Sequence, residues 1–129
     1  SRPEFHVNRV LLMLAAKRFD DAKTLSETLI PQLVAKKKDT PLFRIRGIWA
    51  SKQLNPDKKH IEQSLKAAEE YLKLKGDKDA LALIGMADSL YASGNATKAV
   101  EYADKAIAVA KNPRQKEYFE KQREKYQQK

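Results

Sequence analysis

Apolar residues recur at intervals of three and four along nearly the whole chain, the spacing that gives an α-helix one buried face. The clearest example spans residues 80–113, where one apolar stripe ends at Gly94-Asn95 and a second begins directly after it. Gly94 can take the left-handed conformation that ends a helix, and Asn95 can accept a hydrogen bond from an amide at the start of the next helix. The segment therefore predicts two antiparallel helices joined by a tight turn.

Turn and cap signals divide the rest of the chain into further predicted helices. These signals are Lys17-Arg18, Thr40-Pro41, Asn55-Pro56, Gly76 and Asn112-Pro113. An X-Pro pair favours a helix start, because the first residue can cap the helix and proline suits the first helical position. We expect helices over residues 5–16, from 19 to the lysines at 36–38, over 41–53, from Pro56 to Gly76, and over 114–128.

Two residues inside these segments carry expectations of their own. Pro31 lacks an amide donor, so we expect a kink or an early end in the second helix. Gly47 has no side chain, so we expect a neighbouring helix to approach the third helix closely there. The chain is thus expected to be all-α and to form one domain over residues 1–129, with seven helices arranged as three antiparallel hairpins and a C-terminal capping helix.

The best-defined helical pair resembles the tetratricopeptide repeat, whose 34-residue unit is a helix–turn–helix. The residues that carry the resemblance are Ala87, Gly94, Ala99 and Ala106, at the family's small-residue and turn positions. Leu83 stands where the family usually has Trp, and Pro113 falls about two positions beyond the family's proline. Ala22, Ser64 and Ala99 align as equivalent positions separated by 42 and 35 residues, so the middle unit carries an insertion. The resemblance implies a right-handed solenoid whose first helices line a concave face.

Transferring the family's concave positions residue by residue gives a candidate partner-binding surface. Its residues are Val7, Leu11, Leu14, Arg44, Ile48, Lys52, Leu81, Ile84, Asp88 and Tyr91. An exposed apolar groove on a chain of this kind usually marks an interaction site. The same residues also fit a second interpretation, in which the hairpins curl enough to bury them as core. Trp49 shares this ambiguity with Tyr91, because an aromatic residue at helical spacing fits either a core or a ligand-stacking role.

From Ser64 onward the chain is also similar to helical tails appended to bacterial thioredoxin-like proteins. The shared pattern is a helix with paired alanines, a leucine-rich helix, an aromatic-Ala-x-Gly turn and a helix with alanine at fixed steps. This resemblance implies a neighbouring domain, and because the chain begins with Ser1 rather than Met, we expect it to be a piece of a longer protein. No Cys-x-x-Cys active site carries over, since the chain contains no cysteine.

What the net charge of +9 indicates about a partner depends on where the charges lie along the chain. The 26 Lys and Arg residues are spread along the chain, which suits the solvated outer faces of amphipathic helices. One stretch differs, because residues 40–56 contain no acid while Arg44, Arg46 and Lys52 supply three cations. Converging cations would favour an acidic protein or a nucleic acid as the partner.

Candidate catalytic chemistry is sparse. His6 and His60 are isolated in sequence and fit surface or cap positions better than a metal site. Asp20 and Asp21 fit acids that stabilise a helix N-terminus better than an acid–base pair. There is no Gly-rich phosphate loop, so we predict no enzyme, no cofactor and no metal. The longest apolar run, residues 10–16, is too short to span a bilayer.

The sequence therefore favours a non-catalytic helical-repeat module that binds a peptide or a neighbouring domain through its concave face, as an accessory domain of a larger, thioredoxin-like protein. One alternative is a basic adaptor for nucleic acid or an acidic protein, with Arg44, Arg46 and Lys52 as its contacts. Another is an accessory domain that spaces or dimerises an attached enzyme. Salt dependence separates the first two, because contacts to polyanions weaken steeply as salt rises.

Overall fold

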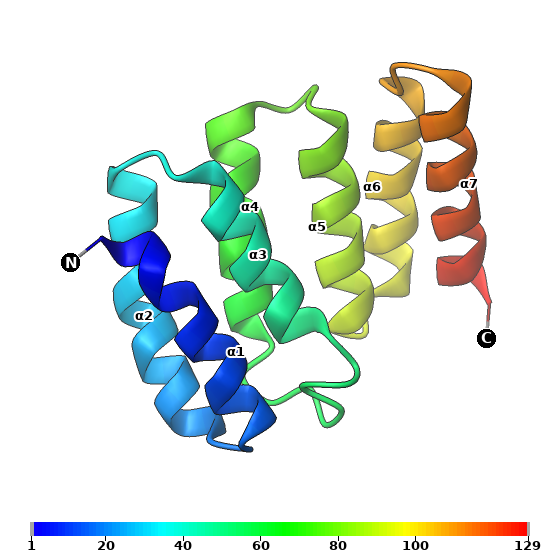
Figure 1. The fold of residues 1–129 in the computed structure, drawn as a ribbon. Helices are drawn as coiled ribbons and strands as arrows, with labels where there is room; N and C mark the ends of the chain where they lie inside the picture. Colours follow the sequence, from blue (N-terminus) through cyan, green and yellow to red (C-terminus); the bar gives the residue numbers. More distant parts are fainter. Residues whose placement is uncertain (1, 129) are drawn as a thin grey trace.

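The computed structural model describes residues 2–128, which fold into helices and connecting loops with no strand in this range (Figure 1). Within it lie a short 3-10 helix, η1 (Pro3–His6), and seven α-helices: α1 (Val7–Ala15), α2 (Phe19–Ala35), α3 (Asp39–Ala50), α4 (Glu62–Lys75), α5 (Ala80–Ala92), α6 (Ala96–Ala108) and α7 (Pro113–Gln127). The expectation of an all-α chain with seven helices is confirmed over these residues. The outermost residues of the expected domain, Ser1 and Lys129, lie outside the described residues.

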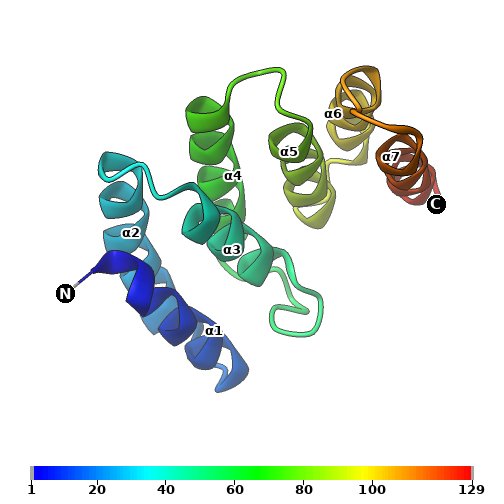
Figure 2. The same cartoon turned by 45° about the horizontal axis from the view of Figure 1, so that its top comes forward.

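Successive helices run antiparallel and pack as neighbours, α1 with α2, α3 with α4, and α5 with α6, while α7 packs against α6 at the far end (Figure 1). A tilted view shows two layers, with α2, α4 and α6 in one and α1, α3, α5 and α7 in the other (Figure 2). Contacts within these layers join α1 to α3, α3 to α5, and α2 to α4. The two ends of the chain therefore lie at opposite ends of the helical stack.

Two hydrophobic clusters hold the layers together. The first is built mainly by α1 to α4 and contains Trp49, whose side chain is fully buried and whose Nε1 donates to Ser26 Oγ at 3.0 Å. The second is built by α4 to α7, where the buried Ala87, Ala99 and Ala106 let the helices approach closely. Trp49 is thus a core residue and not a ligand-stacking one.

The helix starts in the second half of the chain follow their local signals. Gly94 has a φ of 93°, in the left-handed region, and Asn95 Oδ1 accepts a hydrogen bond from Lys98 N at 3.1 Å. Asn112 Oδ1 likewise accepts from Gln115 N at 2.8 Å at the start of α7. These predictions are confirmed, because each signal is satisfied by groups within one helical turn.

The helix start predicted at Asn55-Pro56 is wrong, since residues 51–61 form a loop and α4 begins at Glu62. Asn55 is buried, and its Nδ2 donates to the carbonyls of Trp49 (3.0 Å) and Lys59 (2.8 Å). Its Oδ1 accepts from Lys59 N at 2.9 Å. Asn55 therefore holds the loop against the end of α3 instead of capping a helix.

Other predicted boundaries also shift. Pro31 does not end α2, which continues to Ala35, and Pro31 itself is exposed. The first α-helix begins at Val7, because the residues before it form the 3-10 helix. The third begins at Asp39 and ends at Ala50, a few residues earlier than predicted at each end.

The close approach expected at Gly47 occurs instead at Gly85 in α5. A Cβ added to Gly47 would meet no atom within 4 Å, whereas one added to Gly85 would lie 2.7 Å from Phe43 Cε1. The Phe43 ring is confined by Tyr71, with ring centroids 5.0 Å apart, and by the Arg46 guanidinium, 4.3 Å from its centroid. Gly85 is thus the point where α3 packs directly on α5.

Alanine substitutions at the two glycines should have opposite effects on stability. Gly47→Ala should raise the free energy of unfolding by about 0.5 to 1 kcal/mol, because alanine favours a helix interior and finds open space there. Gly85→Ala should lower it by about 1 to 2 kcal/mol, since overlap with the confined Phe43 ring outweighs the same helical gain. Urea unfolding followed by circular dichroism measures both. Equal stabilisation would show that Phe43 moves aside freely.

Candidate functional site

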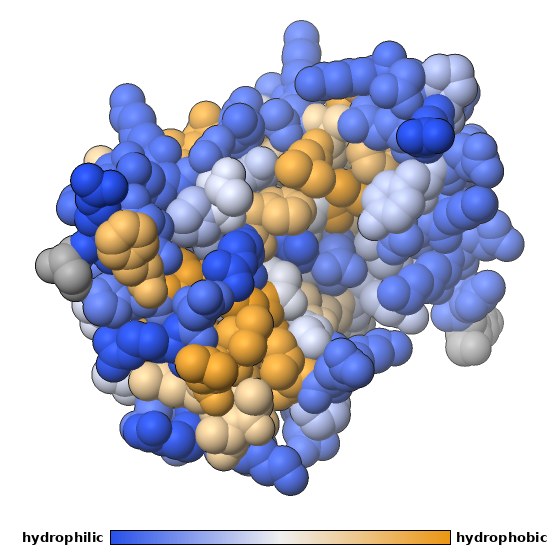
Figure 3. Space-filling model, viewed as in Figure 1, coloured by the Kyte–Doolittle hydropathy of each residue, from blue (hydrophilic) through white to orange (hydrophobic). Residues whose placement is uncertain are grey.

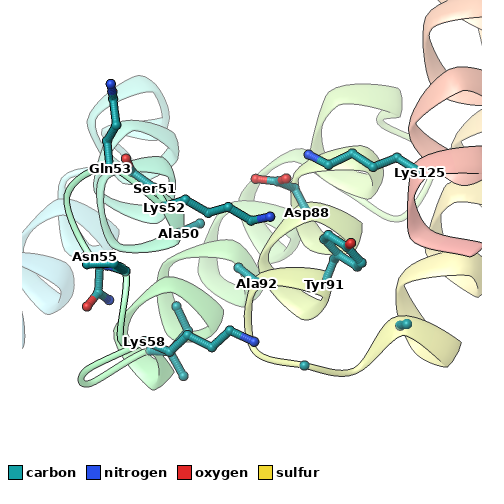
Figure 4. Close-up of a pocket in the computed structure, with 14 residues that line it drawn as sticks. Ala50, Ser51, Lys52, Gln53, Asn55, Lys58, Asp88, Tyr91, Ala92 and Lys125 are labelled. Carbon is teal, nitrogen blue, oxygen red and sulfur yellow. The ribbon is translucent and has the colours of Figure 1, made fainter. Parts of the chain in front are cut away.

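A cleft of about 760 Å³ opens where the α3–α4 loop faces the C-terminal half of α5 and the end of α7. We call it the basic cleft, because Lys52, Lys58 and Lys125 line it together with the single carboxylate of Asp88. The lysine side chains enter from different elements, Lys52 and Lys58 on one side and Lys125 on the other (Figure 4). The rest of the lining consists of Tyr91, of polar residues of the loop (Ser51, Gln53 and Asn55) and of apolar residues such as Ala50, Ile61 and Ala92.

The long α3–α4 loop, residues 51–61, builds one wall of the basic cleft. Besides the contacts of Asn55, the loop is closed by a hydrogen bond from Leu54 N to Ser51 Oγ at 3.2 Å. A Cβ built on Gly94 would lie 3.9 Å from Lys58 Nζ. The absence of a side chain at Gly94 therefore leaves the Lys58 ammonium room to reach the α5–α6 turn.

A second cleft of about 210 Å³ opens nearer the N-terminus of α5. We call it the aromatic cleft. Its apolar lining consists of Phe43, Leu81, Ile84, Tyr118 and Tyr126. Leu81 and Tyr118 are 47% and 55% exposed, so they present apolar surface to solvent. Asp88 lines both clefts, which therefore adjoin on α5.

Arg46 neutralises the carboxylate at the junction of the clefts. Its side chain is buried, and its Nη1 donates to Asp88 Oδ2 at 2.9 Å and to Ser89 Oγ at 3.3 Å. Ser64 Oγ lies 2.8 Å from Ser89 Oγ and also donates to the Arg46 carbonyl at 2.8 Å. The network joins α3, α4 and α5 and fixes the position of Asp88.

The lysines of the basic cleft have no such counter-charge. Among residues 2–128, none of Lys52, Lys58 and Lys125 has a carboxylate within ion-pair distance. Lys125 Nζ instead lies 5.7 Å from the ring centroid of Tyr91. Burial raises the pKa of the Tyr126 phenol, so this neighbour of Tyr91 stays uncharged and does not offset the lysines. The basic cleft therefore carries an excess of positive charge.

Half of the predicted partner-binding residues line the two clefts. These residues are Lys52, Leu81, Ile84, Asp88 and Tyr91. The others lie elsewhere: Val7, Leu14 and Ile48 are buried in the first hydrophobic cluster, Leu11 packs against it, and Arg44 is exposed. For the first helix, the core interpretation thus replaces the groove interpretation, because its apolar stripe packs on neighbouring helices.

The cations expected for a basic adaptor do not converge. Arg46 is buried against Asp88, and Arg44 Nη2 donates to Asn8 Oδ1 in α1 at 2.6 Å. Of the three, Lys52 lines the basic cleft, and Arg46 lines the aromatic cleft with its charge paired to Asp88. Sequence reasoning missed Lys58 and Lys125, which no local pattern distinguishes from other surface lysines.

Two of the titratable residues considered for catalytic chemistry, His60 and Asp20, contact each other. His60 Nε2 lies 2.7 Å from Asp20 Oδ1, and this hydrogen bond lowers the pKa of the Asp20 carboxyl while tying the α3–α4 loop to α2. In the part of the chain that the structure describes, no three His, Cys, Asp or Glu side chains gather in a way that could hold a metal ion. None of the helices described there is long and apolar enough to cross a membrane.

Comparison of the chain with protein-family models, with curated proteins and with solved structures gave no significant match. The two clefts both lie on α5 between α3 and α7, and they differ in chemistry, one cationic and one aromatic.

Proposed function

We propose that this chain is a non-catalytic helical-repeat module that binds a peptide segment across α5, in the basic and aromatic clefts. The observation that carries the proposal is that two clefts of different chemistry adjoin at Asp88. Peptide-binding grooves combine pockets for apolar side chains with a few polar groups that fix orientation. The partner segment belongs to another protein or to a neighbouring domain of the same polypeptide.

The position of the clefts supports a tetratricopeptide-repeat-like architecture as part of this proposal. The clefts are walled by α3, α5 and α7, which share one layer, and the resemblance assigns partner binding to such a layer of first helices. The last helix is more than a polar cap, because it contributes Tyr118 and Lys125. The proposed solenoid thus uses its capping helix as one side of the binding site.

Replacing Leu81 and Tyr118 with serine should weaken peptide binding at least about tenfold, because large apolar side chains that a partner covers dominate binding energy. Both are about half exposed, so the thermal midpoint should hardly change. The probe is a peptide selected on the immobilised chain from a random library of about 12 residues, which spans both clefts at about 3.3 Å per residue. Fluorescence anisotropy of the labelled peptide in solution gives the affinity.

Phe5→Ser with Leu12→Ser is the matched control for this experiment. Both side chains are more exposed than Leu81. Phe5 lies on η1 and Leu12 on α1, and neither lines a cleft. The face seen in Figure 3 carries apolar surface over α1 as well as over α5. Equal weakening by the control pair would indicate nonspecific apolar attraction, and a library without any enriched binder would refute the proposed function.

A further inference from the structure

We propose, on the basis of this function, that the bound segment is acidic. Its carboxylates contact Lys52, Lys58 and Lys125 in the basic cleft, and one large apolar side chain next to them fills the aromatic cleft. Among residues 2–128, no carboxylate forms an ion pair with any of these three lysines.

The uncompensated positive charge of the basic cleft indicates an acidic partner. Two ammonium groups from the α3–α4 loop, those of Lys52 and Lys58, and that of Lys125 from α7 point into the cleft beside the C-terminal half of α5 (Figure 4). The one carboxylate that lines the cleft, Asp88, already has Arg46 at 2.9 Å. The lysines therefore repel one another without a counter-ion, and a ligand that brings carboxylates relieves this repulsion.

The lining favours a peptide over a nucleic acid. Apolar side chains such as Ala50, Ile61 and Ala92 share the cleft with the lysines, and such a mixed lining suits the side chains of a peptide better than a chain of phosphates. Proteins that bind single-stranded nucleic acid typically stack its bases on aromatic faces, but the Tyr91 ring packs against Tyr126, with ring centroids 4.8 Å apart, and lies beside Lys125. A confined cationic cleft suits a few carboxylates better than a polyanion.

The distance between the clefts determines the spacing between acidic and large apolar residues in the sequence of the bound peptide. On α5 the aromatic cleft uses Leu81, Ile84, Gly85 and the shared Asp88, and the basic cleft uses Asp88, Tyr91 and Ala92, so their centres lie about six residues apart. At about 1.5 Å per residue this is about 9 Å, which an extended peptide covers with about three residues. We therefore expect Asp or Glu about three positions from a Phe, Leu or Trp in the selected peptides.

The triple variant Lys52→Glu, Lys58→Glu, Lys125→Glu tests the role of the basic cleft. It should bind the selected peptide at least about tenfold more weakly, because each side chain changes from attracting to repelling the carboxylates. Changing the peptide's Asp and Glu to Asn and Gln should cause a similar loss with the wild-type chain and little loss with the variant. Such a cycle isolates the contact between lysines and carboxylates.

The matched control is a second triple variant, Lys78→Glu, Lys98→Glu, Lys116→Glu. These lysines are exposed and lie outside both clefts, and either triple lowers the net charge from +9 to +3, since each change removes two charges. The control should keep most of the affinity. Equal weakening by both triples would show that total charge and not the cleft attracts the peptide, and would overturn the inference.

Two further outcomes separate this inference from the proposed function. Selected peptides that lack acids, bind the cleft triple normally and still need Leu81 and Tyr118 would overturn the inference and leave the function standing. A single-stranded DNA of about 12 nucleotides is the probe for the rival partner class. It should bind at least about tenfold more weakly than the peptide at about 0.15 M salt. The inference would also be overturned if the DNA bound more tightly than the peptide and if the cleft triple, but not the control triple, abolished this binding.

Discussion

Replacing Trp49 with alanine should lower the free energy of unfolding by about 3 to 5 kcal/mol, a large part of the stability of a domain of this size. The side chain is fully buried, so its removal leaves a cavity among α1 to α4. The indole also accounts for the hydrogen bond to Ser26 and an edge contact with His60, whose ring centroid is 6.2 Å away. Trp49 therefore supports both the first hydrophobic cluster and the loop that walls the basic cleft.

Trp49→Phe separates the loss of stability caused by the cavity from the loss caused by the missing hydrogen bond. Phenylalanine keeps an aromatic ring in place but cannot donate to Ser26, so we expect a smaller loss of about 1 to 2 kcal/mol. Urea unfolding monitored by circular dichroism gives both values. A loss below about 1 kcal/mol for Trp49→Ala would contradict the place of Trp49 in the core.

Asp88→Ala should lower the free energy of unfolding by about 2 to 4 kcal/mol, because it leaves the Arg46 guanidinium buried without a counter-charge. The remaining partners of Arg46 Nη1 are the neutral Ser89 Oγ and Gly85 carbonyl, and Arg46 Nε has no hydrogen-bond partner among residues 2–128. The Asp88 side chain is partly exposed, so we place the loss below that of a fully buried pair. Urea unfolding measures it.

Two variants control for other effects of Asp88→Ala. Asp104→Ala breaks the exposed pair of Arg123 and Asp104, whose atoms lie 2.8 Å apart, and should cost less than about 1 kcal/mol. Adding Arg46→Met to Asp88→Ala should recover most of the loss, since it removes the stranded charge. Similar small losses for Asp88→Ala and Asp104→Ala would mean that the Arg46 charge is well solvated without Asp88.

The parts of the fold that the sequence predicts correctly are those whose signals are satisfied locally. Gly94 and Asn95 end one helix and start the next through groups within one turn, and Asn112 does the same for α7. Asn55-Pro56 has the same local signal as Asn112-Pro113, yet Asn55 bonds to the Trp49 carbonyl and holds a loop. A contact with the preceding helix overrides the cap there, and the dipeptide itself carries no sign of it.

The candidate site is predictable only in part, for a related reason. Helical spacing places Leu81, Asp88 and Tyr91 on the cleft side of α5. Lys58 and Lys125 reach the basic cleft through the shape of a long loop and the docking of the last helix, which depend on tertiary packing. Periodicity alone also does not distinguish an apolar stripe that faces a groove from one that faces another helix.

A titration of the isotope-labelled chain with a selected peptide, followed by backbone amide chemical shifts, tests the central claim that α5 and its two clefts bind the partner. The expected result is that the largest shift changes fall on residues 81–92, on the α3–α4 loop over residues 51–61, and on residues 118–126 of α7. The smallest changes are expected in α2, which contributes to neither cleft. Shift changes concentrated on α2 or α1, with α5 and α7 unaffected, would contradict the account.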